Sequence, residues 1–232
     1  KIIQNKGNYG FAQGYNEGLK KIDAEYFCLL NSDVEVTENW IEPIEKLFDN
    51  NLDIAAIQPK ILDYKNKEYF EYAGAGGGFI DKFGYPFCRG RVFSTLEKDN
   101  GQYNDTAQIF WATGASLFIR KKDFFVQNGF DEEFFAHMEE IDLCWRLNNA
   151  GRKIYYCGES TVYHLGGATL DKANPKKWYL NYRNSLWMML KNLPANKLFP
   201  MLFTRLSMDG IAAVAFLPKQ GLPHVWAVFI SH

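Results

Sequence analysis

Residues 26–35 have the sequence YFCLLNSDVE, and this stretch decides the fold class. Its first five residues form a short, continuous apolar run, which is typical of a strand buried on both faces of a parallel sheet. Apolar residues at helical spacing precede the run from Phe11 to Ile22 and follow it from Trp40 to Phe48. Thr37 is the expected N-cap of the second helix. The stretch therefore predicts a strand between two helices, with polar residues at its carboxyl end.

The remainder of the chain continues this alternation. Short apolar runs predict further strands at residues 54–57, 116–119, 153–156 and 160–164. Residues 139–150 predict a helix that Gly151 ends. Strands separated by helices favour an α/β sandwich with a mostly parallel sheet flanked by helices.

Composition excludes several classes of protein. The 232 residues are 47% hydrophobic and 16% aromatic, which excludes a disordered chain and is sufficient for one sizeable core. The net charge of −1 gives no overall basic field, so we expect no nucleic acid partner. The four cysteines have no zinc-site spacing and are expected to be reduced thiols in the cytoplasm.

The charge is unevenly distributed. Residues 172–232 hold eight Lys or Arg residues and one acidic residue, whereas the preceding part is acidic. A shift of this kind, with glycines and a proline near residues 165–178, predicts a boundary between two parts, residues 1–170 and residues 171–232.

Three polar residues, Asn31, Asp33 and Glu35, follow the first predicted strand. In open α/β sheets, ligands bind at the carboxyl ends of strands, where carboxylates can hold Mg²⁺ or Mn²⁺ together with substrate phosphates. Asp33 is the first candidate ligand. Glu35 is the second, because alternate residues of an extended segment share a face. An Asx turn at the strand end explains the same residues without a metal.

Residues 137–142, HMEEID, contain three carboxylates within four positions. A carboxylate near a helix N-terminus can serve as a general base. Arg146 lies one turn after Asp142 and is expected to pair with it, which leaves Glu139 and Glu140 for chemistry. A solvated acidic first turn is the alternative.

Three further segments are weaker signals. His164 ends a predicted strand and is either a metal ligand or an ordinary hydrogen-bonded side chain. Residues 7–16, GNYGFAQGYN, resemble a phosphate-binding turn before a helix but fit neither the dinucleotide fingerprint nor the P-loop. The glycines between Glu71 and Arg91 predict either a mobile loop or hairpin over a cleft, or a plain glycine-rich hairpin.

Together and in this order, four motifs resemble those of family 2 glycosyltransferases with the GT-A fold, close to the bacterial rhamnosyltransferase-like members. The resemblance covers essentially the whole chain, and residues 129–146 are its most distinctive part. It implies a Rossmann-like GT-A catalytic domain over residues 1–170 that acts as a hexosyltransferase. The motifs are NKGNYGFA at residues 5–12, LNSD at 30–33, GFDEEFFAHMEEIDLCWR at 129–146 and VYHLGG at 162–167.

The resemblance also implies a role for each motif. Asp33 matches the last acid of the family's DxD-type metal motif, in which Asn31 replaces the first acid, and His164 matches a histidine that often completes the metal site. Glu140 matches the general base toward the acceptor hydroxyl, with Glu139 beside it. The residues that match the nucleotide-sugar pocket are Asn5, Gly10, Asn16, Asn31 and Asp33, and those that match the acceptor side are Trp111, Thr113 and Gly114.

These roles imply an inverting, metal-dependent transferase. It would move a sugar from a dTDP- or UDP-sugar to a hydroxyl of a glycan or lipid-linked acceptor in cell-surface polysaccharide synthesis. Crowding by Glu139 and Asp142 is expected to raise the pKa of Glu140, which suits a base near neutral pH. The alternatives are a sugar nucleotidyltransferase and a catalytically inactive scaffold subunit.

Family members ordinarily begin with a strand, a helix and a second strand that carries an Asp against the nucleotide base. The sequence begins after that unit, at Lys1. We therefore expect the domain to lack part of the nucleotide pocket and to have weak or no activity by itself.

Residues 178–232 combine basic, aromatic and apolar residues. Residues 178–193 form a helical apolar stripe. Residues 198–217 are apolar, but Pro200, Arg205 and Asp209 interrupt them, which argues against a transmembrane span. The segment predicts peripheral membrane contact at the anionic inner face of the cell membrane. Packing on the catalytic domain or a homodimer interface is the alternative.

Overall fold

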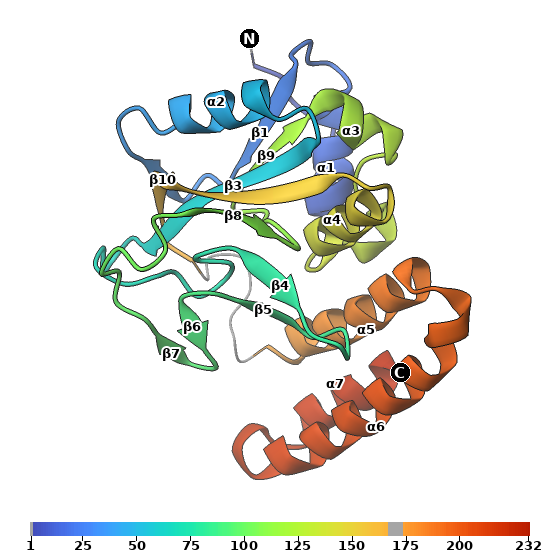
Figure 1. Ribbon diagram of the computed structural model, residues 1–232. Helices are drawn as coiled ribbons and strands as arrows, with labels where there is room; N and C mark the ends of the chain where they lie inside the picture. Colours follow the sequence, from blue (N-terminus) through green and yellow to red (C-terminus); the bar gives the residue numbers. More distant parts are fainter. Residues whose placement is uncertain (1, 167–173) are drawn as a thin grey trace.

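The structure, a computed structural model, describes residues 2–166 and 174–232 and is built around a six-stranded sheet. The strand order is β1-β9-β3-β10-β2, and β8 also pairs with β10 (Figure 1). A β-bulge between Cys157 and Thr161 divides β10, so that its first half pairs with β8 and its end pairs with β2. The strands are β1 (Tyr26–Leu30), β2 (Val34–Val36), β3 (Ile54–Asp63), β8 (Thr106–Ile109), β9 (Ser116–Arg120) and β10 (Lys153–His164).

Helices cover both faces of this sheet. The helix α2 (Glu42–Asn50) lies on one face, where Ile44 and Phe48 pack against Ile57 of β3. The opposite face carries α1 (Gly10–Leu19), α3 (Lys121–Val126) and α4 (Glu139–Asn149), with a 3₁₀ turn at Glu132–Phe134 before α4. The larger hydrophobic core lies under these helices. The result is a three-layer α/β arrangement, and the residues that follow its strands are available to form a binding site.

The predicted α/β class is confirmed, but the prediction of a mostly parallel sheet is wrong. Among the described strands, β3 and β10 form the parallel pair, and the other pairings in this sheet are antiparallel. The β1 strand lies at one end of the strand order and buries Phe27 and Leu29, while Cys28 between them is exposed. The prediction failed because an apolar run does not distinguish a strand buried on both faces from an end strand whose Tyr26 stacks on a helix residue, Phe48.

Two element boundaries also differ from the predictions. The strands predicted at 153–156 and 160–164 are the two halves of β10, which continues through its bulge. Thr37 does not cap α2, because the helix begins at Glu42 and the Thr37 hydroxyl donates to the Thr161 carbonyl at 2.8 Å.

The glycine-rich segment forms small hairpins rather than one long loop. Gly78 at the start of β4 (Gly78–Ile80) lies against the Trp111 ring, where an added Cβ would come within 2.1 Å of a ring carbon. The strand β5 (Pro86–Cys88) pairs with β4, and β6 (Arg91–Val92) pairs with β7 (Thr95–Leu96). Both interpretations of this segment allow hairpins, so its position over a cleft stays a prediction.

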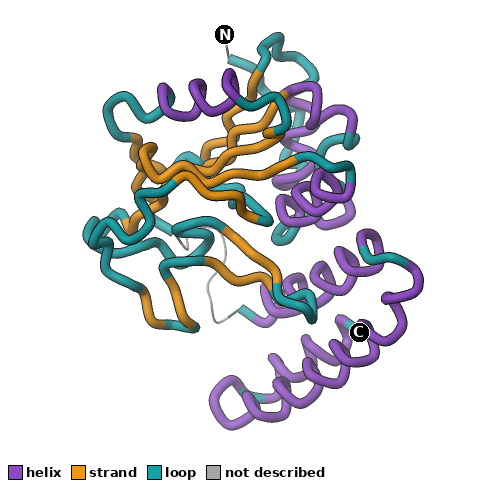
Figure 2. Tube along the Cα trace, in the orientation of Figure 1, coloured by secondary structure: helices purple, strands orange, loops and turns teal. Residues whose placement is uncertain are grey.

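The C-terminal part consists of α5 (Pro175–Asn192), α6 (Ala195–Gln220) and α7 (Leu222–Ser231). Figure 2 shows these helices below the sheet, with α6 and α7 farthest from it. The helix α5 packs against α4, and α7 packs against both α5 and α6. The predicted boundary at residues 170/171 lies outside the described residues.

Candidate active site

Asp33 and His164 lie next to each other where β1 and β10 end. After β1, residues 32 and 33 form a turn, and the Leu165 amide donates to the Asp33 carbonyl at 3.0 Å. The His164 Nε2 atom lies 3.4 Å from Asp33 Oδ1. On the other side of the ring, His164 Nδ1 lies 3.7 Å from Glu71 Oε1. The imidazole therefore stands between two carboxylates that belong to distant parts of the sequence.

The charges around His164 affect the pKa of its imidazole more than its burial does. The residue is 8% exposed, and burial by itself would lower the pKa of the imidazole. The Glu71 and Asp33 carboxylates raise the pKa further than burial lowers it, so the net direction is upward. Both contacts are longer than a good hydrogen bond, and Nδ1 is buried without a hydrogen-bond partner.

The donor chemistry of this cluster fits a divalent cation. Asp33 offers hard oxygen and His164 offers nitrogen, a set that Mn²⁺ accepts. Within residues 2–166 and 174–232, no group of three Asp, Glu, His or Cys side chains is arranged to hold a metal ion. Two protein donors are nevertheless sufficient for a metal that shares its other positions with substrate phosphates and water. Glu71 lies 3.7 Å from the other ring nitrogen, on the side from which a carboxylate ordinarily orients a ligating histidine, although it makes no hydrogen bond to that nitrogen.

Glu35 does not belong to this cluster. Its carboxylate forms an exposed ion pair with Lys67, and it lies opposite Tyr163 in the pairing of β2 with β10. His164 is the next residue along β10, so its side chain points to the other face of the sheet. The prediction that Asp33 and Glu35 share a face is wrong, because the turn at residues 32–33 interrupts the extended alternation.

Glu139 and Glu140 begin α4 behind an unusual stretch of backbone. Phe135, His137 and Met138 all have positive φ, at 61°, 71° and 72°, which non-glycine residues rarely adopt. Glu139 is 5% exposed, and the Oε2 atoms of both glutamates are buried without a hydrogen-bond partner. Burial of both carboxylates excludes a solvated first turn. Strain and unpartnered carboxylate atoms in one segment make it a candidate functional site.

Burial raises the pKa of both carboxyl groups. For Glu139 burial is the largest cause, and the neighbouring charge of Glu140 raises the pKa further. For Glu140 burial dominates, while the backbone amides of Gly114 and Ile141 oppose it. The predicted direction for the Glu140 pKa is confirmed, but the predicted cause is wrong, because burial raises this pKa and neither Glu139 nor Asp142 does. Asp142 is paired at 2.8 Å with Arg146, as predicted.

A short loop at residues 112–115 connects the two clusters. Its Ala115 carbonyl accepts from the Asn31 amide at 3.0 Å, and its Gly114 amide lies against the Glu140 carboxylate. Gln58 holds the loop from below, because its Oε1 accepts from the Thr113 amide at 2.8 Å and its Nε2 donates to the Gly74 carbonyl at 2.7 Å. The predicted base thus contacts the same loop as Asn31, which lies two residues before Asp33.

Two predicted binding residues have structural roles instead. The buried Asn16 amide donates to the Phe130 carbonyl at 2.8 Å and accepts from the Phe130 amide at 3.0 Å, so no polar atom is left for a nucleotide. Trp111 is 7% exposed and donates to the Phe79 carbonyl at 2.7 Å, which makes it part of the core rather than an acceptor contact. The sequence alone does not distinguish a residue that makes structural hydrogen bonds of this kind from one that contacts a ligand.

Three further residues that were predicted to line the nucleotide pocket make contacts that neither establish nor exclude that role. Asn5 donates to the Gly14 carbonyl at 3.0 Å and so holds its segment against α1. Gly10 starts α1 with φ of 76°, close to the Phe135 carbonyl, and only glycine takes this conformation freely. Asn31 is half-buried at the end of β1. Their contact with a nucleotide remains a prediction.

The sequence analysis missed Asn184 of α5. This residue is fully buried, and its Nδ2 atom lies within hydrogen-bond distance of the carbonyls of Phe134, Ala136 and His137, at 3.0, 2.9 and 2.7 Å. The α5 helix thereby holds the positive-φ stretch that precedes Glu139. Nothing in the apolar stripe of residues 178–193 indicated this contact.

Comparisons with known proteins identify the family and the fold. The family pattern described as Glycosyl transferase family 2 matches residues 1–124. The chain is 27% identical over 157 residues to the rhamnosyltransferase WbbL of Escherichia coli K12, covering 65% of this chain and 58% of the relative. It is 39% identical over 79 residues to N-acetylglucosaminyl-diphospho-decaprenol L-rhamnosyltransferase of Mycobacterium tuberculosis, covering 34% of this chain and 26% of the relative. The chain thus spans between a quarter and three fifths of these relatives.

Two solved structures share the fold. GalNAc-T7 with UDP, GalNAc and Mn²⁺ aligns with a TM-score of 0.58 at 14% identity, over 82% of this chain and 36% of that chain. The mannosyltransferase PcManGT from Pyrobaculum calidifontis, in complex with GDP-Man and Mn²⁺, aligns with a TM-score of 0.52 at 9% identity, over 100% of this chain and 61% of that chain. At such identities the likeness shows the fold alone, and it confirms the GT-A expectation.

Proposed function

This chain belongs to glycosyl transferase family 2, and on that premise we propose that it is an inverting transferase that moves a sugar from a nucleotide diphosphate to an acceptor hydroxyl. One observation carries the proposal. Asn31, two residues before the Asp33 of the Asp33–His164–Glu71 cluster, and the Glu140 carboxylate both contact the loop at residues 112–115. Such an arrangement offers a diphosphate site and a base on either side of one reacting centre.

The donor side is assigned to Asp33 and His164, which would hold Mg²⁺ or Mn²⁺, with Glu71 orienting the imidazole. A divalent cation bound there neutralises charge on the diphosphate leaving group. A metal is supported by the Mn²⁺ in the two structures of similar fold. A dTDP- or UDP-sugar is the proposed donor. UDP in one of those structures supports the second choice.

The acceptor side is assigned to Glu140, which takes the proton from the attacking hydroxyl. Burial raises its pKa, so its conjugate acid is weaker than an ordinary carboxylic acid and the ionised group is a stronger base. Attack from the face opposite the nucleotide inverts the anomeric carbon in one displacement. No carboxylate is then needed as a covalent nucleophile.

The acceptor is proposed to be a glycan or a lipid-linked sugar in cell-surface polysaccharide synthesis at the cytoplasmic face of the membrane. Support comes from the Mycobacterium tuberculosis relative, whose name specifies a diphospho-decaprenol acceptor. A nucleotidyltransferase is disfavoured, since the buried Glu139–Glu140 pair would have no role in that reaction.

The test is sugar-nucleotide turnover with Mn²⁺ over a panel of dTDP-, UDP- and GDP-sugars, with wild type beside Glu140→Gln. We expect the variant to lose at least 10²-fold in turnover while nucleotide binding stays within about twofold. Binding without turnover in the wild type would favour the scaffold alternative. Turnover retained in Glu140→Gln would refute the assignment of the base.

A further inference from the structure

The surface of α6 and α7 is unusually apolar for helices at the edge of a protein. Both helices lie at the end of the molecule farthest from the sheet (Figure 1). Among the described helices, α6 alone is long and apolar enough to cross a bilayer by length and composition. The large apolar side chains that are more than half exposed are Phe199, Phe203, Ile211 and Val214 on α6, and Leu222, Trp226, Phe229 and Ile230 on α7.

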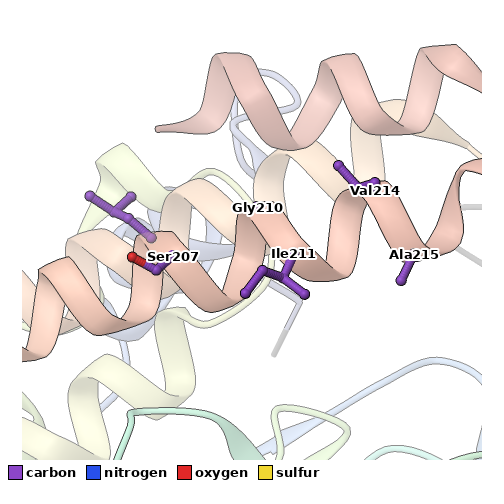
Figure 3. Close-up of a pocket in the computed structure, with 6 residues that line it drawn as sticks. Ser207, Gly210, Ile211, Val214 and Ala215 are labelled. Atoms are coloured by element: carbon purple, nitrogen blue, oxygen red, sulfur yellow. The ribbon is translucent and has the colours of Figure 1, made fainter.

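An open hollow of about 590 Å³ lies along α6 and includes the exposed Ile211 and Val214 (Figure 3). It is lined by Leu206, Ser207, Gly210, Ile211, Val214 and Ala215. Ser207 supplies the only side-chain polar atom of the lining, and its hydroxyl donates back to the Phe203 carbonyl at 2.8 Å. The hollow therefore offers apolar contact to an occupant and no polar side chain to recognise one.

The opposite side of α6 is fixed to the rest of the protein by a buried ion pair. Arg205 and Asp209 are 3% and 1% exposed, and Arg205 Nε lies 3.0 Å from Asp209 Oδ2. Arg205 also donates to the Ser185 hydroxyl of α5 at 2.8 Å and to the Gly84 carbonyl at 3.0 Å, and the Tyr85 hydroxyl donates to Asp209 at 2.7 Å. A membrane-spanning α6 would break this network and place two charges in lipid, so α6 does not span a bilayer.

The charge that remains exposed on α6 is positive. Asp209, the single acidic residue after position 171, is buried against Arg205. Lys197 and Lys219 are exposed near the two ends of the helix, which a rise of 1.5 Å per residue places roughly 33 Å apart. An apolar surface with cations and no exposed acid matches a surface of anionic lipid.

We propose that the α6–α7 apolar surface docks into the interfacial region of an anionic bilayer, with α6 lying in the membrane plane and its Arg205–Asp209 side facing the catalytic domain. The sequence predicted membrane contact over residues 178–232, and the structure narrows it to α6 and α7, because α5 packs on α4. The docked helices would hold the active site beside a lipid-linked acceptor, and only this last consequence rests on the proposed function.

The experiment is flotation of the full chain with phosphatidylglycerol–phosphatidylcholine vesicles and with pure phosphatidylcholine vesicles. We expect the wild type to float with the anionic vesicles and to release at high salt. The double variant Ile211→Glu and Trp226→Glu is expected to bind at least about tenfold more weakly. Leu52→Glu, at a residue that is 76% exposed on the catalytic domain, is the matched control and should bind like the wild type.

Wild-type protein that stays unbound with both kinds of vesicle would overturn the proposal. It would also be overturned if the wild type were a dimer in solution that Ile211→Glu dissociates, without any flotation, because a second copy would then cover this surface. Circular dichroism and sugar-nucleotide turnover are measured for each variant as controls for an intact fold. Flotation itself needs no turnover, so the binding result is independent of the proposed reaction.

Discussion

The buried carboxylates of the candidate site are expected to make the free energy of unfolding depend on pH. The pKa of Glu139 in the folded state is raised well above its ordinary value, mainly by burial. A carboxyl group whose pKa is higher in the folded state binds its proton more tightly there. Its contribution to stability is therefore complete below the unfolded-state pKa and is lost as pH rises through the folded-state pKa.

Glu139→Gln should accordingly stabilise the protein at neutral pH, since the glutamine remains uncharged. We expect a gain of about 1 kcal/mol, or ~2–4 °C in melting temperature, which shrinks as the pH falls and Glu139 becomes protonated. Thermal melts of wild type and variant across pH 4–8 measure the difference. Glu38→Gln, at an exposed carboxylate, should show no such trend. A gain at acid pH that vanished at neutral pH would contradict the burial argument.

Asn184 is the clearest example of a side chain that positions the site without touching substrate. Its amide hydrogens face three carbonyls of the stretch before Glu139. Asn184→Asp keeps the shape but removes the donors. We expect turnover to fall about 10–100-fold, because the glutamates lose their orientation, while binding of the nucleotide donor changes by less than about twofold.

The same change at Asn181, a half-buried residue on the same helix, is the control and should leave turnover nearly unchanged. Steady-state kinetics at a temperature well below both melting points separate the two effects. Equal losses of turnover and donor binding in Asn184→Asp would indicate general disruption of the fold and would refute a positioning role.

Helices and strands were predicted well from sequence where their pattern is local. The helices around residues 11–22 and 139–150 follow from apolar spacing and from Gly151, which has φ of 76° after α4. Strand direction and the length of β10 depend on partners elsewhere in the chain, so no local pattern contained them. The predicted residues Asp33 and His164 lie together and Glu140 is buried, while their metal-binding and catalytic roles stay predictions. Asn16 and Trp111 instead make long-range core contacts that no local pattern indicates.

The attachment of α6 depends on one buried pair. Removing a single partner leaves an uncompensated buried charge, so Asp209→Asn should cost about 3–5 kcal/mol of unfolding free energy. The double variant Arg205→Met and Asp209→Leu should recover most of that loss, because both charges are removed together. Chemical denaturation measures both. Breaking the exposed pair Lys98–Glu68 with Glu68→Gln should cost at most about 1 kcal/mol.

Across the whole chain, the site is assembled from segments that only the sheet brings together. Asp33 follows β1, Glu71 follows β3, and His164 ends β10. A measurement of metal-dependent donor binding therefore tests both the metal-binding role of these residues and their proximity in the fold. Glu71→Gln keeps the side-chain volume but weakens the orientation of the His164 ring, and loss of such an orienting carboxylate typically costs 10–100-fold in metal affinity.

We expect Glu71→Gln to weaken Mn²⁺-dependent binding of the nucleotide donor about 10–100-fold by calorimetry, and chelation of the metal to remove the difference from wild type. Glu35→Gln is the control. Its carboxylate is paired with Lys67 on the other face of the sheet, so donor binding should not change. The opposite result, weaker donor binding in Glu35→Gln and normal binding in Glu71→Gln, would contradict this assignment. It would favour the metal site at Asp33 and Glu35 that the sequence predicted, with the donor on the opposite face of β10.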